Sequence, residues 1–131
     1  MNKKTILITG GNGFIGTRIG NILRKQGHNV LSIDLAGPNN IDLSKKASQS
    51  RVTEYLVRHR VDVVCHMAAL VGGGKYLHEK EWDICSHNAQ TDMNVLTWFL
   101  ESRIPERFVY CTSSMVFQNG TSPCIEKHVE N

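Results

Sequence analysis

A glycine-rich turn between an apolar run and an amphipathic segment limits the folds open to this sequence. The turn reads Thr-Gly-Gly-Asn-Gly-Phe-Ile-Gly over residues 9–16. Glycines at these points allow a tight turn, a close approach of the backbone to a pyrophosphate, and close packing of a helix on a strand. The helix that follows would offer free N–H groups and partial positive charge to phosphates. The turn therefore predicts a strand–turn–helix unit that binds a dinucleotide.

The rest of the chain alternates short apolar runs with longer periodic segments. We expect strands at residues 4–9, 29–33, 62–67 and 107–112, with a further short strand around Ile41, and helices at 14–26, 50–60 and 79–102. Residues 72–74 are expected to form a loop. On the last helix, one face is lined by Cys85, Ala89, Met93, Leu96 and Leu100. This alternation predicts an α/β fold with a doubly wound parallel sheet of the Rossmann type, and a ligand at the carboxyl ends of the strands.

An acidic residue ends the second expected strand. Asp34 lies 18 positions after Gly16. A carboxylate there can accept hydrogen bonds from the hydroxyls of an adenosine ribose and would repel a 2′-phosphate, which favours NAD over NADP. We therefore interpret residues 1–131 as one NAD-binding Rossmann domain, incomplete because its sheet stops after about the fifth strand.

Composition argues against several other classes. The net charge is +3 and the basic residues are scattered, which is not typical of a nucleic-acid-binding protein. No stretch approaches the roughly 20 apolar residues of a membrane helix. The 4 cysteines form no C-x-x-C pair, so we expect no metal site and reduced thiols in a cytoplasmic protein.

The glycine-rich turn resembles the start of the extended short-chain dehydrogenase/reductase family, which includes NAD-dependent sugar epimerases and dehydratases. The resemblance continues in order through Asp42-Leu43, His66-Met67-Ala68-Ala69, Asn88 and the segment 109–117, Val-Tyr-Cys-Thr-Ser-Ser-Met-Val-Phe. It implies that the cofactor is bound by Gly10, Gly13, Phe14, Ile15, Gly16, Asp34, Leu35, Asp42, Leu43, Met67, Ala68, Ala69 and Asn88.

The same resemblance implies a catalytic role for Ser113, whose hydroxyl would hydrogen-bond the reacting sugar oxygen and support proton transfer. The alternative is a serine at a strand end that bonds only to the backbone. His66 is expected to set the cofactor loop and not to act as a general base.

The Tyr-x-x-x-Lys motif of the family is not found between Ser113 and Asn131. Members carry Tyr-x-x-x-Lys on a later helix, where the lysine lowers the tyrosine pKa. The match that does occur, Tyr76 with Lys80, precedes Ser113, and we interpret it as coincidence. Phe117-Gln118 also stands where many relatives have Tyr-Gly. We therefore expect this chain to bind NAD but to be inactive alone.

In the complete enzyme, the resemblance implies transient hydride transfer on a nucleotide sugar. Two alternatives stay open: a non-catalytic NAD-binding or partner-binding module, and an NADP-dependent reductase related to GDP-fucose synthase. The second is suggested by the loop Val71-Gly72-Gly73-Gly74, which resembles that of GDP-sugar enzymes. Uncovered apolar surface, including part of the last helix, predicts self-association or a homo-oligomer.

Overall fold

The computed structural model describes residues 2–112, apart from the side chain of Leu77. Ser113 and the Phe117-Gln118 pair lie outside the described residues. The elements follow in the order β1 (Thr5–Thr9), α1 (Phe14–Lys25), β2 (Asn29–Ile33), a 3-10 turn η1 (Lys46–Ser48), α2 (Gln49–His59), β3 (Val63–His66), α3 (Gly74–Glu79), α4 (Glu81–Ser102) and β4 (Arg107–Tyr110). The expected α/β alternation is confirmed, with α3 as an addition in the segment expected to be a loop.

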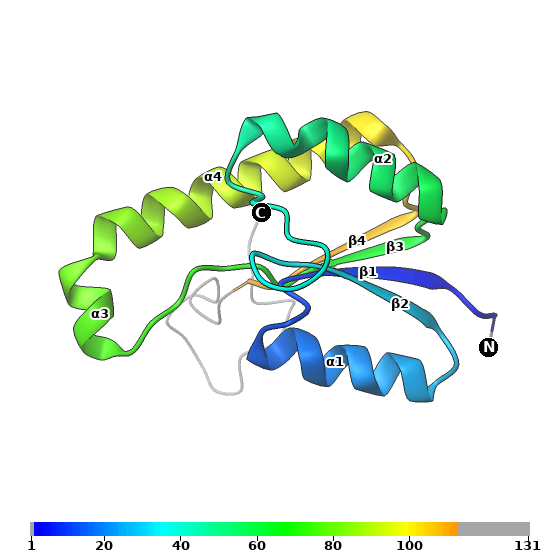
Figure 1. Ribbon diagram of the computed structural model, residues 1–131, viewed down its shortest axis with the longest axis horizontal. Helices are drawn as coiled ribbons and strands as arrows, with labels where there is room; N and C mark the ends of the chain where they lie inside the picture. Colours follow the sequence, from blue (N-terminus) through cyan, green and yellow to red (C-terminus); the bar gives the residue numbers. More distant parts are fainter. Residues whose placement is uncertain (1, 113–131) are drawn as a thin grey trace, which may run out of the picture.

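The four strands form one parallel sheet in the order β2-β1-β3-β4. Helix α1 lies on one face of this sheet, and α2 and α4 lie on the other, as Figure 1 shows. The expected strand around Ile41 is reduced to an isolated bridge between Asp34 and Asn40, so the described sheet has four strands and not five. The arrangement is a doubly wound, Rossmann-type sheet.

The two central strands, β1 and β3, are the most buried because both of their faces are covered. Leu7, Ile33 and Val64 point toward α2 and α4, where Leu56 and Trp98 complete the larger core cluster. The side chains of Ile6, Ile8 and Cys65 point the other way and pack against Ile19 and Leu23 of α1. This packing fixes the carboxyl ends of β1 and β3 side by side.

The face of α4 that packs against the rest of the molecule is not the face on which apolar residues recur at regular spacing. Met93 and Leu100 are 63% and 69% exposed, and Cys85 and Ala89 are also exposed, whereas Leu96 is half-buried. The face against the rest of the molecule carries Ile84, Thr91, Asn94, Val95 and Trp98. Its polar members are hydrogen-bonded, since Thr91 donates to the carbonyl of His87 and Asn94 to the carbonyl of Leu43. Part of the apolar surface of α4 is thus uncovered, as expected.

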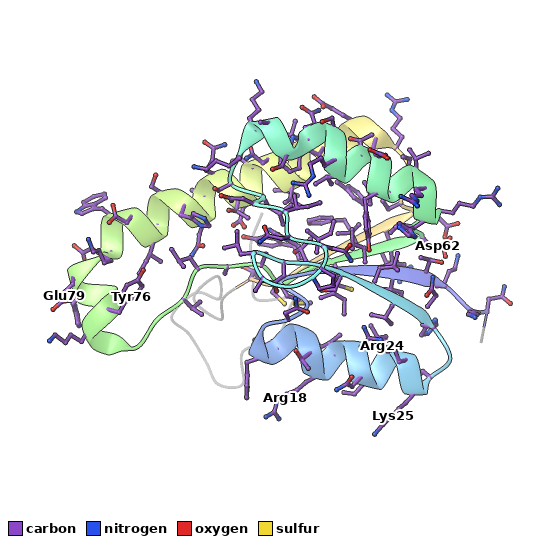
Figure 2. The ribbon with its side chains drawn as sticks, viewed as in Figure 1. Arg18, Arg24, Lys25, Asp62, Tyr76 and Glu79 are labelled. Carbon is purple, nitrogen blue, oxygen red and sulfur yellow. The ribbon has the colours of Figure 1, made fainter. Side chains whose placement is uncertain are left out.

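Tyr76 and Lys80 do not form a working pair. Tyr76 belongs to α3, which projects away from the sheet in Figure 2. The Lys80 ammonium lies 3.6 Å from a carboxylate oxygen of Asp83 on α4. This geometry agrees with a coincidental match. Across residues 2–112, no helix is both long enough and apolar enough to cross a membrane.

Candidate functional site

A pocket of about 450 Å³ opens at the carboxyl ends of β1 and β3. The strand order changes direction here, because β2 lies on one side of β1 and β3 on the other. Open α/β sheets bind ligands at such a switch point. Of the residues expected to bind a cofactor, those lining the pocket are Gly10, Gly13, Phe14, Ile15, Gly16, Asp34, Leu35, Asp42, Leu43, Met67, Ala68 and Ala69.

The glycine-rich turn brings the backbone directly to the pocket wall. A Cβ atom on Gly16 would overlap the carbonyl oxygen of Gly10 and would lie 2.8 Å from the Cα of Gly11. Helix α1 begins after Gly13, and no side chain caps its N-terminus. The first N–H groups of an α-helix lack intrahelical acceptors. Glycine at position 16 thus lets the start of α1 pack directly on the turn, and the free N–H groups of that start fit a diphosphate.

Asp34 is fixed at the rim of the pocket by its neighbours. The backbone N–H of Asn12 donates to Asp34 Oδ2 at 2.9 Å, and the N–H of Ala36 lies 3.4 Å from Oδ1. The side-chain amide of Asn12 donates to the carbonyl of Ala36 at 2.5 Å and ties the two loops together. The carboxylate keeps lone pairs for a ligand, which fits ribose hydroxyls.

Asp42 and Leu43 line the pocket from the loop between β2 and η1. Ser44 donates to Asp42 Oδ1 through its hydroxyl at 2.7 Å and through its backbone N–H at 3.0 Å. These bonds hold the pKa of the Asp42 carboxyl below its ordinary value, with smaller contributions from the charges of Lys45 and His87. Asp42 is therefore an ionised acceptor at neutral pH.

His66 lies beneath the pocket and not inside it. Its side chain is 2% exposed, with Nδ1 2.6 Å from the hydroxyl of Thr9 and Nε2 3.1 Å from Asp92 Oδ1. Burial lowers the pKa of the imidazole below its ordinary value, although Asp92 acts in the opposite direction. His66 is not among the residues that line the pocket, which agrees with the expectation that it is not a general base.

Asn88 occupies a different place from the other expected residues, because it is not among those lining the pocket. Its side chain accepts from the N–H of Leu70 at 2.7 Å and donates to the carbonyl of Leu70 at 3.0 Å. This two-way bond holds the end of the loop that carries Met67, Ala68 and Ala69. The geometry indicates support of the loop rather than direct contact.

Other lining residues escaped the sequence analysis. They are Ile41, Leu70, Val71, His87, Thr91 and Cys111. Val71 belongs to a motif already noted, whereas His87 and Thr91 lie one helical turn apart on α4 with no local signal of a ligand. The Nδ1 atom of His87 is buried without a hydrogen-bond partner within the described residues. Cys111 lies two positions before Ser113, which is outside the described residues.

The charge of the pocket is acidic. Asp34 and Asp42 both line it, and no lysine or arginine is found among the lining residues of the described part. Arg18, the nearest basic side chain on α1, lies over the Phe14 ring at 4.1 Å from its centroid. Figure 2 shows Arg18 on the outer side of α1. The wall that surrounds Asp34 therefore suits hydroxyl groups better than an additional phosphate.

Comparison with known proteins gives a consistent result. The profile of the NAD dependent epimerase/dehydratase family matches residues 6–131. A UDP-N-acetyl-alpha-D-glucosaminuronate decarboxylase from Bacillus cytotoxicus is 31% identical over 95% of this chain and 41% of its own length. A probable GDP-L-fucose synthase from Drosophila melanogaster is 29% identical over 98% of this chain and 39% of its own length. The chain thus spans about two fifths of these relatives.

Solved structures share the fold. A UDP-glucose 4-epimerase from Stenotrophomonas maltophila, solved with bound NAD, superposes with a TM-score of 0.75 at 20% identity, covering 94% of this chain and 41% of the other. A GDP-D-glycero-L-gluco-heptose synthase from Campylobacter jejuni, solved in the presence of NADPH, gives a TM-score of 0.73 at 21% identity, covering 98% and 36%. At these identities the likeness establishes the architecture alone.

Proposed function

Because this chain belongs to the NAD-dependent epimerase/dehydratase family, we propose that it is the NAD-binding portion of an enzyme that acts on a nucleotide sugar by transient hydride transfer. The observation that carries this proposal is the pocket at the switch point, where the uncapped start of α1 and the carboxylate of Asp34 face the same space. The start of α1 suits the diphosphate of an adenosine diphosphate, and the Asp34 carboxylate suits its ribose hydroxyls.

Different residues would bind different parts of the cofactor. The backbone N–H groups of Phe14, Ile15 and Gly16 would bind the diphosphate, Asp34 the adenosine ribose, and Asp42 with Leu43 the adenine. Bound NAD would supply the hydride acceptor, and the protein would orient the nicotinamide against the sugar. Ser113 is proposed as the hydroxyl that bonds the reacting sugar oxygen. A nucleotide-sugar substrate and a cytoplasmic location belong to the same proposal.

The choice of NAD over NADP rests on charge. Family members use either cofactor, as the two solved structures with NAD and with NADPH illustrate. In this chain, Asp34 would lie against a 2′-phosphate, and no lining lysine or arginine of the described residues would compensate. Repulsion of two anions across a partly enclosed pocket favours the free ribose hydroxyl.

Isothermal titration calorimetry with NAD and NADP tests this proposal. We expect NAD to bind at least about tenfold more tightly, because a hydrogen bond to a charged group contributes about 1.5–3 kcal/mol. Asp34→Asn should reduce that preference, whereas Glu54→Gln, which removes one charge from an exposed position on α2, should preserve it. Tighter binding of NADP would refute the cofactor assignment, and binding of neither dinucleotide would refute the function.

A reductase that uses NADP is the second candidate. Similarity to a probable GDP-L-fucose synthase favours it, as does the Val71-Gly72-Gly73-Gly74 loop, of which Val71 lines the pocket. The same titration separates the two candidates, because the reductase requires the opposite order of affinities.

A further inference from the structure

Three side chains stand in one row across the sheet where the strands end. Thr9 of β1 pairs in register with His66 of β3, which pairs in register with Tyr110 of β4. Asp92 joins the row from α4, because its Oδ1 lies 3.1 Å from His66 Nε2 and its Oδ2 accepts from the Tyr110 hydroxyl at 2.6 Å. The row thus connects three strands and one helix directly beneath the pocket.

The contacts around Thr9 assign a direction to the hydrogen bonds of this row. The N–H of Ala68 lies 3.3 Å from Thr9 Oγ1, and the N–H of Met67, which donates to the Thr9 carbonyl at 3.1 Å, lies 3.2 Å from the same hydroxyl oxygen. With two N–H groups directed at this oxygen, we assign its hydrogen to His66 Nδ1, 2.6 Å away, which is then unprotonated. A neutral imidazole carries its hydrogen on the other nitrogen, so Nε2 donates to Asp92.

We infer that Asp92 is a positioning residue for the cofactor pocket. Its carboxylate accepts the Nε2 hydrogen of His66 and thereby holds the tautomer that lets Thr9 anchor the amides of Met67 and Ala68. Both Met67 and Ala68 line the pocket. The position of this part of the pocket wall therefore depends on the Asp92 carboxylate of α4. The inference rests on the proposed function to the extent that the pocket is taken to hold a dinucleotide.

Burial makes the acceptor necessary. His66 and Thr9 are 2% and 3% exposed, so water does not replace a lost partner for either side chain. The Asp92 side chain is 30% exposed, so it can be changed with less disturbance of the core than His66 or Thr9. Removing it would leave the Nε2 hydrogen without an acceptor unless the imidazole changed tautomer.

Two substitutions distinguish the loss of the hydrogen-bond acceptor from a change in the shape of the side chain. Asp92→Leu keeps a side chain branched at Cγ but accepts no hydrogen bond. Asp92→Asn keeps an oxygen for His66 Nε2–H and turns an amide toward the oxygen of Tyr110. Asp92→Ala is measured as well, in case Asp92→Leu does not fold, because alanine has a high helix propensity. The results expected of Asp92→Leu are also expected of Asp92→Ala.

The first measurement is the tautomer of His66 in the 131-residue chain labelled with ¹⁵N-histidine. His66→Gln identifies its signal among the 6 histidines. We expect the Nε2–H form in the unchanged chain and in Asp92→Asn, and a population of the Nδ1–H form in Asp92→Leu. An unchanged tautomer in Asp92→Leu would overturn the inference.

The second measurement is the dissociation constant for NAD. We expect about a five- to tenfold weakening in Asp92→Leu and a change within about twofold in Asp92→Asn, because the amide restores the acceptor. Equal weakening in both variants, or none in Asp92→Leu, would also overturn the inference. If the unchanged chain shows the expected tautomers but binds no dinucleotide, the proposed function fails while the tautomer control by Asp92 stands.

Discussion

Gly16 and Gly20 lie one turn apart on α1, and both are buried, yet their neighbours differ in kind. Gly16 faces the backbone of the turn, where a Cβ atom would overlap the carbonyl oxygen of Gly10. Gly20 faces the end of the Arg24 side chain, whose Nη1 atom would lie 3.1 Å from a Cβ atom. The backbone atoms of a tight turn cannot move away from an added Cβ atom, whereas the exposed guanidinium of Arg24 can rotate away. The same mutation therefore has different consequences at the two positions.

We expect Gly16→Ala to destabilise the fold by about 2–3 kcal/mol, the usual range for overpacking against an immobile neighbour. Gly20→Ala serves as the control and should leave stability unchanged or raise it by up to about 1 kcal/mol, because alanine favours a helix. Urea unfolding followed by circular dichroism measures both. Equal stability of the two variants would contradict the close packing at Gly16.

At the scale of the element, α1 and α2 end in the same hydrogen-bond pattern but with different residues. After α1, the N–H groups of Gly27 and His28 donate to the carbonyls of Arg24 and Leu23. After α2, those of Arg60 and Val61 donate to the carbonyls of Val57 and Leu56. This is the Schellman motif, which needs a left-handed residue after the helix. Gly27 has a φ of 89° and Arg60 a φ of 49°.

The left-handed conformation costs an L-residue about 1–2 kcal/mol. We therefore expect Arg60→Gly to raise the free energy of unfolding by about 1 kcal/mol, and Gly27→Ala to lower it by a similar amount. Among the described residues, and apart from its two chain neighbours, no atom lies within 4 Å of a Cβ placed on Gly27, so that loss would report backbone strain.

Arg58→Gly is the matched control, because Arg58 lies inside α2 in the right-handed conformation. There glycine should lower stability by about 1 kcal/mol. Thermal or urea denaturation that gave Arg58→Gly and Arg60→Gly effects of the same sign would show that the helix end is not strained.

At the scale of the whole molecule, α4 presents an apolar stripe away from the sheet. Trp82, Met93 and Leu100 are 81%, 63% and 69% exposed on this helix. Exposed apolar side chains that share one face of a helix offer a surface to another apolar surface. Self-association on this ground stays a prediction.

We expect the chain to associate as its concentration rises, and Met93→Glu combined with Leu100→Glu to shift it toward the monomer. Ser50→Glu combined with Arg58→Glu places two new carboxylates on exposed positions of α2 and should leave association unchanged. Sedimentation velocity over a range of concentrations distinguishes these cases. A monomer at every concentration would contradict the prediction.

Local pattern predicted most of the elements, although it placed a loop where α3 begins and a strand around Ile41. The glycine-rich turn and Asp34 each follow the end of a strand in the sequence, and carboxyl ends of parallel strands meet at one edge of a sheet. The pocket-lining positions from these two segments could therefore be named from the pattern. The resemblance to a family added Asp42 and Leu43 and the stretch Met67, Ala68 and Ala69.

Residues that depend on packing between distant segments were not accessible in this way. Spacing along α4 showed which side chains share a face, but it could not show that the face with Thr91 and Asn94 is the buried one. It likewise gave no sign that His87 reaches the pocket or that Asp92 meets His66.

The order of residues therefore determined the alternation of strands and helices and the turn that prepares α1 for a diphosphate, because each depends on neighbours a few positions apart. The parallel sheet was predicted from that alternation, because a helical crossover joins parallel strands. Tertiary structure alone decided which surface of α4 is covered, that the segment around Ile41 forms a bridge and no strand, and how Thr9, His66, Tyr110 and Asp92 are joined. The physical reason is that burial and hydrogen-bond partners across a sheet depend on strand register and helix packing, which bring together groups far apart in the chain.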